Sequence, residues 1–184
     1  MNSNARRQTL SDLVRRSARR FPAKLAIVCG DTQWSYAELD RTVDQLAGAL
    51  AGRSIAAGDR VAVLARNSHG FVALRFALAR LGAVLVPINF MLKADEVAYI
   101  LRHAGARMLA TDSGLAALAR KAAAIDTSVS EFLWLPSEDA TEPAEGMTRF
   151  DELVGLGIEP PEMLLNGSEL LQIVYTSGTE SSPK

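Results

Sequence analysis

Short apolar runs alternate with longer amphipathic segments between residues 60 and 135, and this alternation constrains the fold strongly. Val61–Leu64 is a continuous apolar run, which is typical of a strand covered on both faces. Further strands are predicted over 84–88, 107–111 and 132–135, and helices over 68–81, 93–104 and 115–125. This order predicts an α/β fold with a mostly parallel sheet, right-handed crossovers and helices on both faces.

The first sixty residues predict two helices and a hairpin beside that sheet. The helices are expected over 10–20, after Thr9, and from 36 to 52, and the hairpin strands over 25–29 and 32–35. Ser35 lies three residues before Glu38, which is the spacing of a capping box at the start of a helix. The single Cys29 excludes an internal disulfide, and its apolar neighbours indicate a buried strand thiol.

The segment 170–184, LLQIVYTSGTESSPK, joins an apolar run to a hydroxyl-rich loop. Leu171–Tyr175 is apolar, β-branched and aromatic, so it predicts a buried strand. Hydroxyl side chains then surround Gly178 and precede Lys184, and a nest of such donors with a cation binds phosphate well. A polar surface loop is the alternative interpretation, because Ser/Thr/Gly-rich loops are common. A Walker A loop is excluded, since Pro183 stands where its second glycine would be.

Composition excludes several classes of protein. Hydrophobic residues make up 48% and charged residues 22% of the 184 residues, as in ordinary globular domains. The formal net charge of −1 gives no basis for binding nucleic acid or an anionic membrane. No apolar run approaches the roughly 18 residues of a membrane span, and the first ten residues lack a secretory signal core. We therefore expect a cytoplasmic protein.

The terminal loop resembles the phosphate-binding signature of the adenylate-forming enzymes, [YF]-T-S-G-[ST]-T-G-x-P-K. Seven positions match it: Tyr175, Thr176, Ser177, Gly178, Thr179, Pro183 and Lys184. Glu180 and Ser181 depart from the usual Thr and Gly: Glu180 brings a negative charge towards a phosphate site, and Ser181 lacks glycine's backbone freedom.

Three earlier stretches resemble the same family in the same order. They are TQWSYAEL at 32–39, GDRVAVLARNS at 58–68 and LGAVLVPIN at 81–89. The Pro-Ile-Asn ending of the third is similar to fatty acyl-CoA synthetases, whereas amino-acid adenylation domains usually carry Asp at the last position. The resemblance therefore covers nearly the whole chain.

The resemblance implies an ATP-dependent, AMP-forming acyl-CoA ligase of the fatty-acid type. A carboxylate attacks the α-phosphorus of ATP, and the thiol of CoA then takes the acyl group from the acyl-adenylate. The family pattern implies that the β- and γ-phosphates of ATP, with Mg²⁺, are held by Thr176, Ser177, Gly178, Thr179 and Lys184. Three alternatives stay open: an aryl- or other acid-CoA ligase, a ligase that loads a carrier protein, and a non-catalytic binding module with a degenerate loop.

The resemblance also predicts how the chain is organised. Residues 1–184 would be the N-terminal part of an AMP-binding domain: an α/β subdomain over 1–135, a surface connection over 136–167 with a helix near 150–154, and the strand and phosphate loop over 168–184. The rest of the large domain and the C-terminal domain with its catalytic lysine would be absent. We therefore expect no catalytic or metal-ligating residue within these residues, no activity from them alone, and self-association through exposed apolar surface.

Other candidate side chains favour structural roles. His69 at a helix start is expected to cap the helix or lie on the surface, and His103 near a helix end to offset the helix dipole. Trp34 and Trp134 are expected in the core, and Asp95-Glu96 to be first-turn helix acids rather than a metal pair.

Overall fold

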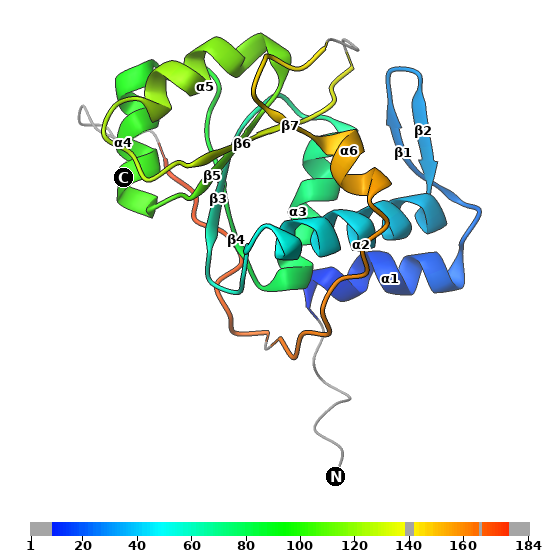
Figure 1. The fold of residues 1–184 in the computed structure, drawn as a ribbon. Helices are drawn as coiled ribbons and strands as arrows, with labels where there is room; N and C mark the ends of the chain where they lie inside the picture. Colours follow the sequence, from blue (N-terminus) through cyan, green and yellow to red (C-terminus); the bar gives the residue numbers. More distant parts are fainter. Residues whose placement is uncertain (1–8, 139–141, 166, 177–184) are drawn as a thin grey trace.

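The computed structural model describes residues 9–138, 142–165 and 167–176. Within them, a five-stranded sheet has the order β4-β3-β5-β6-β7, and β1 and β2 form a separate antiparallel hairpin (Figure 1). The strands are β1 (Leu25–Cys29), β2 (Thr32–Ser35), β3 (Arg60–Leu64), β4 (Val84–Pro87), β5 (Met108–Thr111), β6 (Glu131–Trp134) and β7 (Thr148–Arg149). All four strand pairings in the larger sheet are parallel, so the predicted parallel sheet is confirmed.

The described residues form six α-helices and a short 3-10 turn. They are α1 (Leu10–Arg20), α2 (Tyr36–Gly52), α3 (His69–Leu81), α4 (Ala94–Ala104), η2 (Ser113–Leu115), α5 (Ala116–Ala123) and α6 (Phe150–Gly155). The predicted capping box starts α2: the Glu38 carboxylate accepts the Ser35 N–H at 2.7 Å, and Ser35 Oγ accepts the Glu38 N–H at 3.3 Å. Gly82 ends α3 in the left-handed region, with φ 69°.

The sheet is buried on both faces, which explains why β3 is apolar throughout. Val61 and Val63 pack in a cluster with α1, α2, α3 and α6. Ala62 and Leu64 point to the other face and pack with α4 and α5. Figure 1 shows the same two helical layers, so the prediction of helices on both faces is confirmed.

The connection over 136–167 is not confined to the surface. β7 extends the sheet beside β6, with Leu133 opposite Thr148. Phe150 and Leu153 of α6 are buried in the cluster that contains α2. The helix predicted near 150–154 is confirmed, whereas the prediction of a surface connection omits a strand and a buried contact.

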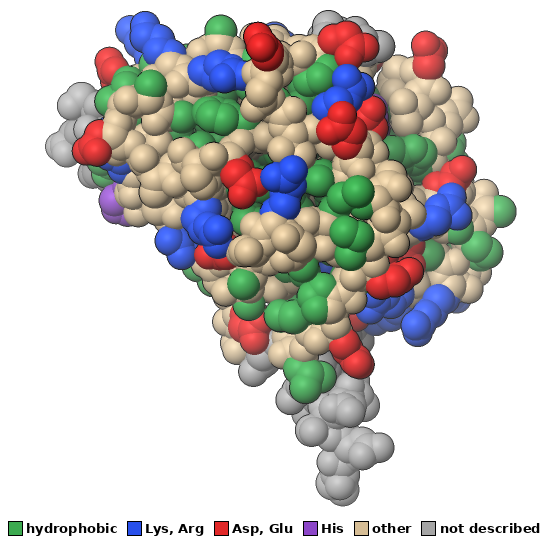
Figure 2. Space-filling view, viewed as in Figure 1, with side chains coloured by type: hydrophobic (Ala, Val, Ile, Leu, Met, Phe, Trp, Pro, Cys, Tyr) green, Lys and Arg blue, Asp and Glu red, His purple; other side chains and the backbone are tan. Residues whose placement is uncertain are grey.

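The outer surface mixes apolar and charged side chains. Figure 2 shows acidic, basic and hydrophobic side chains interspersed on the face viewed in Figure 1. None of the helices in the described part of the chain is both long enough and apolar enough to cross a membrane.

Gly48 marks a close approach between α2 and the end of the 136–167 connection. A Cβ at Gly48 would overlap the carbonyl oxygen of Ile158 and come within 2.9 Å of the carbonyl carbon of Glu159. Both neighbours are backbone atoms, which cannot rotate away as a side-chain end can. Gly52, at the end of the same helix, would meet nothing within 4 Å.

We predict that Gly48→Ala destabilises the protein by about 1–2 kcal/mol, although alanine is the better helix former. Gly52→Ala is the matched control and should leave stability unchanged or slightly raised. Urea unfolding followed by circular dichroism measures both changes. Equal stability of the two variants would show that α2 and Ile158 are not in close contact.

Candidate functional site

The segment before the predicted phosphate loop is joined to β4 at one point. Gln172 forms a single parallel bridge with Leu85. The Leu85 N–H donates to the carbonyl of Leu171 at 3.1 Å, and the Ile173 N–H donates to the carbonyl of Leu85 at 3.0 Å. Because the bridge is parallel, the segment continues in the direction of β4, and Figure 1 shows it running beside the sheet towards α4.

The prediction of a buried strand over Leu171–Tyr175 is wrong. The structure has one bridge there rather than a strand, and Leu171 and Val174 are 36% and 55% exposed. The segment lies at the edge of the sheet, and among the described residues it pairs only with β4. Ile173 and Tyr175 pack against the cluster around α4 and α5, whereas Val174 is left uncovered.

Tyr175 fixes the end of this segment to α4. Its hydroxyl oxygen lies 2.7 Å from Nδ1 of His103, and the two rings meet edge to face. Burial, with a smaller contribution from Tyr99, raises the pKa of Tyr175, so its phenol keeps its proton at neutral pH. His103 lies in the last turn of α4, where a helix-dipole role was predicted, but the sequence gave no sign of its contact with Tyr175.

Only the first of the predicted phosphate ligands is described. Thr176 directly follows Tyr175, and its side chain is exposed. The other predicted ligands lie outside the described residues: Ser177, Gly178, Thr179 and Lys184. The structure therefore gives the starting point of the predicted loop, and its phosphate contacts stay a prediction.

Asp112 joins the carboxyl ends of the central strands β3 and β5. Its carboxylate is buried and accepts the Arg66 N–H at 2.9 Å and the Leu115 N–H at 3.0 Å. β4 lies on one side of β3 and β5 on the other, so the order of the strands along the chain reverses between β3 and β5. Open α/β sheets bind ligands at such topological switch points. The sequence predicted Asp112 only as the start of a helix.

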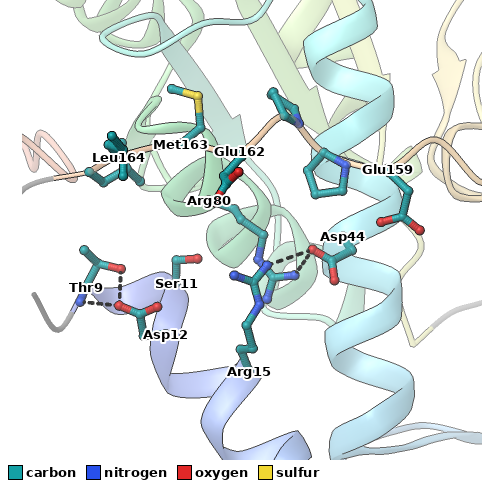
Figure 3. Close-up of a pocket in the computed structure, with 13 residues that line it drawn as sticks. Thr9, Ser11, Asp12, Arg15, Asp44, Arg80, Glu159, Glu162, Met163 and Leu164 are labelled. Atoms are coloured by element: carbon teal, nitrogen blue, oxygen red, sulfur yellow. Dashed lines mark hydrogen bonds and ion pairs between the residues drawn. The ribbon is translucent and has the colours of Figure 1, made fainter. Parts of the chain in front are cut away.

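A cavity of about 440 Å³ lies between α1, α2, α3 and the strap over 159–165 (Figure 3). Arg80 is 4% exposed there; it donates to Asp40 at 2.6 Å and is also paired with Asp44. Arg15 binds Asp44 from α1 at 3.2 Å, as the dashed lines in Figure 3 show. These charges neutralise one another, and none of the lining residues belongs to 171–176, so the cavity is separate from the described start of the predicted phosphate loop.

His69 is buried, so the expected capping or surface role is wrong. Its side chain is 7% exposed, and its ring lies edge-on to Trp34 with the centroids 5.0 Å apart. Ser68 caps α3 instead, since its Oγ accepts the Phe71 N–H at 3.1 Å. Burial lowers the pKa of His69 by disfavouring its charged form, and its buried Nδ1 has no hydrogen-bond partner among the described residues.

Of the remaining structural assignments, those of the two tryptophans and of the first-turn acids of α4 are confirmed, whereas the expected burial of Cys29 is wrong. Trp134 is buried in the core, and Trp34 packs against it. Asp95 and Glu96 lie in the first turn of α4, and the Glu96 carboxylate accepts the Lys93 N–H at 2.8 Å. Cys29 is a free thiol that is only partly buried, because its strand belongs to the two-stranded hairpin rather than to the central sheet.

Comparison with known proteins assigns this fold to a family. The family model "AMP-binding enzyme" matches residues 14–184. The chain belongs to the AMP-binding enzyme family. This membership confirms the resemblance read from the terminal loop and from the three earlier stretches.

The relatives of this AMP-binding chain include ligases for different acids. A feruloyl-CoA synthase from Amycolatopsis is 32% identical over 179 residues, which cover 97% of this chain and 33% of that protein. The long-chain-fatty-acid–CoA ligase FadD13 of Mycobacterium tuberculosis is 32% identical over 157 residues, covering 84% of this chain and 29% of that protein. The chain thus spans about a third of the length of these relatives.

A solved structure confirms the fold. The anthranilate CoA ligase AuaEII, in complex with anthranoyl-AMP, superposes with a TM-score of 0.88 over 100% of this chain and 35% of its own. At 23% identity, this similarity shows a shared fold.

The burial of His69 predicts a loss of stability in acid. Its folded pKa lies below the ordinary value of 6.5, so the unfolded chain takes up the proton first as the pH falls through 6.5. Between pH 7.5 and 5.5, the wild type should lose at most about 1.4 kcal/mol more than His69→Gln. Urea unfolding at both pH values tests this, and an identical pH dependence of the two proteins would contradict it.

Proposed function

We propose that this chain supplies the N-terminal part of an ATP-dependent, AMP-forming acid–CoA ligase whose substrate is a fatty acid. The observation that carries the proposal is the signature that starts at Tyr175, in a chain that belongs to the AMP-binding enzyme family. The placement of Tyr175 and Thr176 supports it, because the signature begins at the edge of a parallel sheet whose two faces are buried. The Pro-Ile-Asn sequence at 87–89 supports the fatty-acid assignment.

In this proposal, the loop neutralises and aligns the polyphosphate while a carboxylate attacks the α-phosphorus. The hydroxyls of Thr176, Ser177 and Thr179 and the loop amides at Gly178 donate hydrogen bonds to the β- and γ-phosphates. Lys184 adds a positive charge, and Mg²⁺ supplies further charge when bound. The acyl-adenylate then passes its acyl group to CoA, and pyrophosphate and AMP are the leaving groups of the two steps.

An aromatic acid is the second candidate substrate. The feruloyl-CoA synthase matches this chain at the same identity as the fatty-acid ligase and over a larger share of it. A panel of medium- and long-chain fatty acids beside hydroxycinnamic and benzoic acids separates the two candidates. Preference for the aromatic acids would replace the fatty-acid assignment and keep the ligase class.

Cytoplasmic localisation and a role in fatty-acid metabolism also belong to the proposal. So does the inactivity of the 184 residues alone, since the acyl pocket and the catalytic lysine would come from the rest of the enzyme. We also propose that these residues self-associate, because several large apolar side chains are exposed to solvent, including Leu164 at 85% and Met91 at 80% exposure.

The test is acid-dependent ATP–pyrophosphate exchange by the full-length protein that carries this chain. We expect exchange with at least one class of acid and a roughly 10²-fold loss in Lys184→Ala, because a cation on the leaving pyrophosphate is removed. Lys121→Ala is the matched control, since this exposed lysine lies on α5 and is not part of the signature that starts at Tyr175. Exchange with no acid would refute the ligase, and equal activity of both variants would refute the role of Lys184.

A further inference from the structure

Residues 171–176 are attached to the rest of the molecule by few contacts. Two backbone hydrogen bonds join them to Leu85, and two side chains, Ile173 and Tyr175, pack on the cluster around α4 and α5. Among these described residues, the hydrogen bond between Tyr175 and His103 is the only one that a side chain makes. It is also the attachment nearest to Thr176, the first predicted phosphate ligand.

We propose that His103 is a positioning residue for the phosphate-binding loop, acting through its hydrogen bond to the hydroxyl of Tyr175. The inference rests on the proposed function, because it concerns how the ATP-binding loop begins. Neither side chain needs to touch the nucleotide for this role. The contact would fix the residue before Thr176, so that the loop loses less conformational freedom when ATP binds.

His103 is well placed to hold a fixed direction. Its ring stacks on Tyr99, one helical turn earlier on α4, with the ring centroids 5.7 Å apart and the planes at 18°. The Tyr175 ring meets the His103 ring edge to face, with the planes at 83° and the centroids 5.7 Å apart. An imidazole held by stacking can present Nδ1 to one partner, and the 2.7 Å distance to the Tyr175 hydroxyl meets the geometry of a good hydrogen bond.

The direction of this hydrogen bond depends on the tautomer of His103. Its phenol stays protonated at neutral pH, so the hydroxyl can donate to Nδ1 when His103 carries its proton on Nε2. The other wall of the Tyr175 site is the apolar cluster that contains Ile173 and the side chains of α4 and α5. The hydrogen bond therefore gives a defined orientation to a ring that apolar packing alone would leave free to slide.

Steady-state kinetics of ATP–pyrophosphate exchange in the full-length protein test this role. We expect Tyr175→Phe and His103→Ala each to raise the KM for Mg-ATP about fivefold, with kcat changed less than twofold. Without this contact the start of the loop must be ordered when the nucleotide binds, at a cost of up to one net hydrogen bond. The double variant should be no worse than either single variant, since both remove the same contact.

Two variants control for a general effect on the fold. Tyr99→Phe also removes a phenolic hydroxyl but keeps the ring under His103, so its KM should equal that of the wild type. His103→Asn places an amide near the position of Nδ1 and should restore at least half of the lost affinity. A thermal unfolding midpoint within about 2 °C of the wild type for Tyr175→Phe would accompany the raised KM.

The outcomes separate the inference from the function it rests on. An active wild type with an unchanged KM in Tyr175→Phe, or with the same increase in Tyr99→Phe, would overturn the positioning role and keep the ligase. A wild type without acid-dependent exchange would overturn the proposed function and this inference together.

Discussion

The backbone of Leu85 accepts one hydrogen bond from Ile173 and donates another to Leu171, and the placement of the candidate site depends on this pairing. The bridge is parallel to β4, so it sends the chain along the sheet in the direction in which the sheet's own strands end. Loops that bind ligands in open α/β proteins lie at that end. The position of Tyr175 and Thr176 is therefore a consequence of sheet geometry, and the chemistry of the loop is added to it.

The sheet can hold this edge in place because its central strands are buried on both sides. Val61 and Val63 face one helical layer, and Ala62 and Leu64 face the other. One layer is formed by α1, α2, α3 and α6. The other is formed by α4 and α5, and residues 173 and 175 pack against it. Helix α4 of this second layer carries His103, which binds Tyr175.

Local patterns in the sequence were sufficient for the features that neighbouring residues determine. The capping box of Ser35 and Glu38 and the end of α3 at Gly82 follow from backbone chemistry within one helical turn. The helices and strands between residues 60 and 135 follow from apolar periodicity, because both faces of the sheet are covered. Family membership followed from motifs in a fixed order rather than from any single residue.

The features that the sequence did not show depend on distant partners. β7 is two residues long and polar, so it has no periodicity and exists only because β6 offers an open edge. The burial of His69 depends on Trp34, which belongs to the hairpin, and the exposure of Val174 depends on what covers the sheet edge. The contact of His103 with Tyr175 joins positions 72 residues apart, and each side chain alone is unremarkable on its element.

The central claim is that a nucleotide-binding loop follows Tyr175, and equilibrium binding of Mg-ATP to the full-length protein tests it most directly. Titration calorimetry without any acid substrate isolates binding from catalysis. The account predicts saturable binding of one Mg-ATP per chain. A folded protein that releases no heat of binding with Mg-ATP, and that retains no nucleotide in equilibrium dialysis, would contradict it.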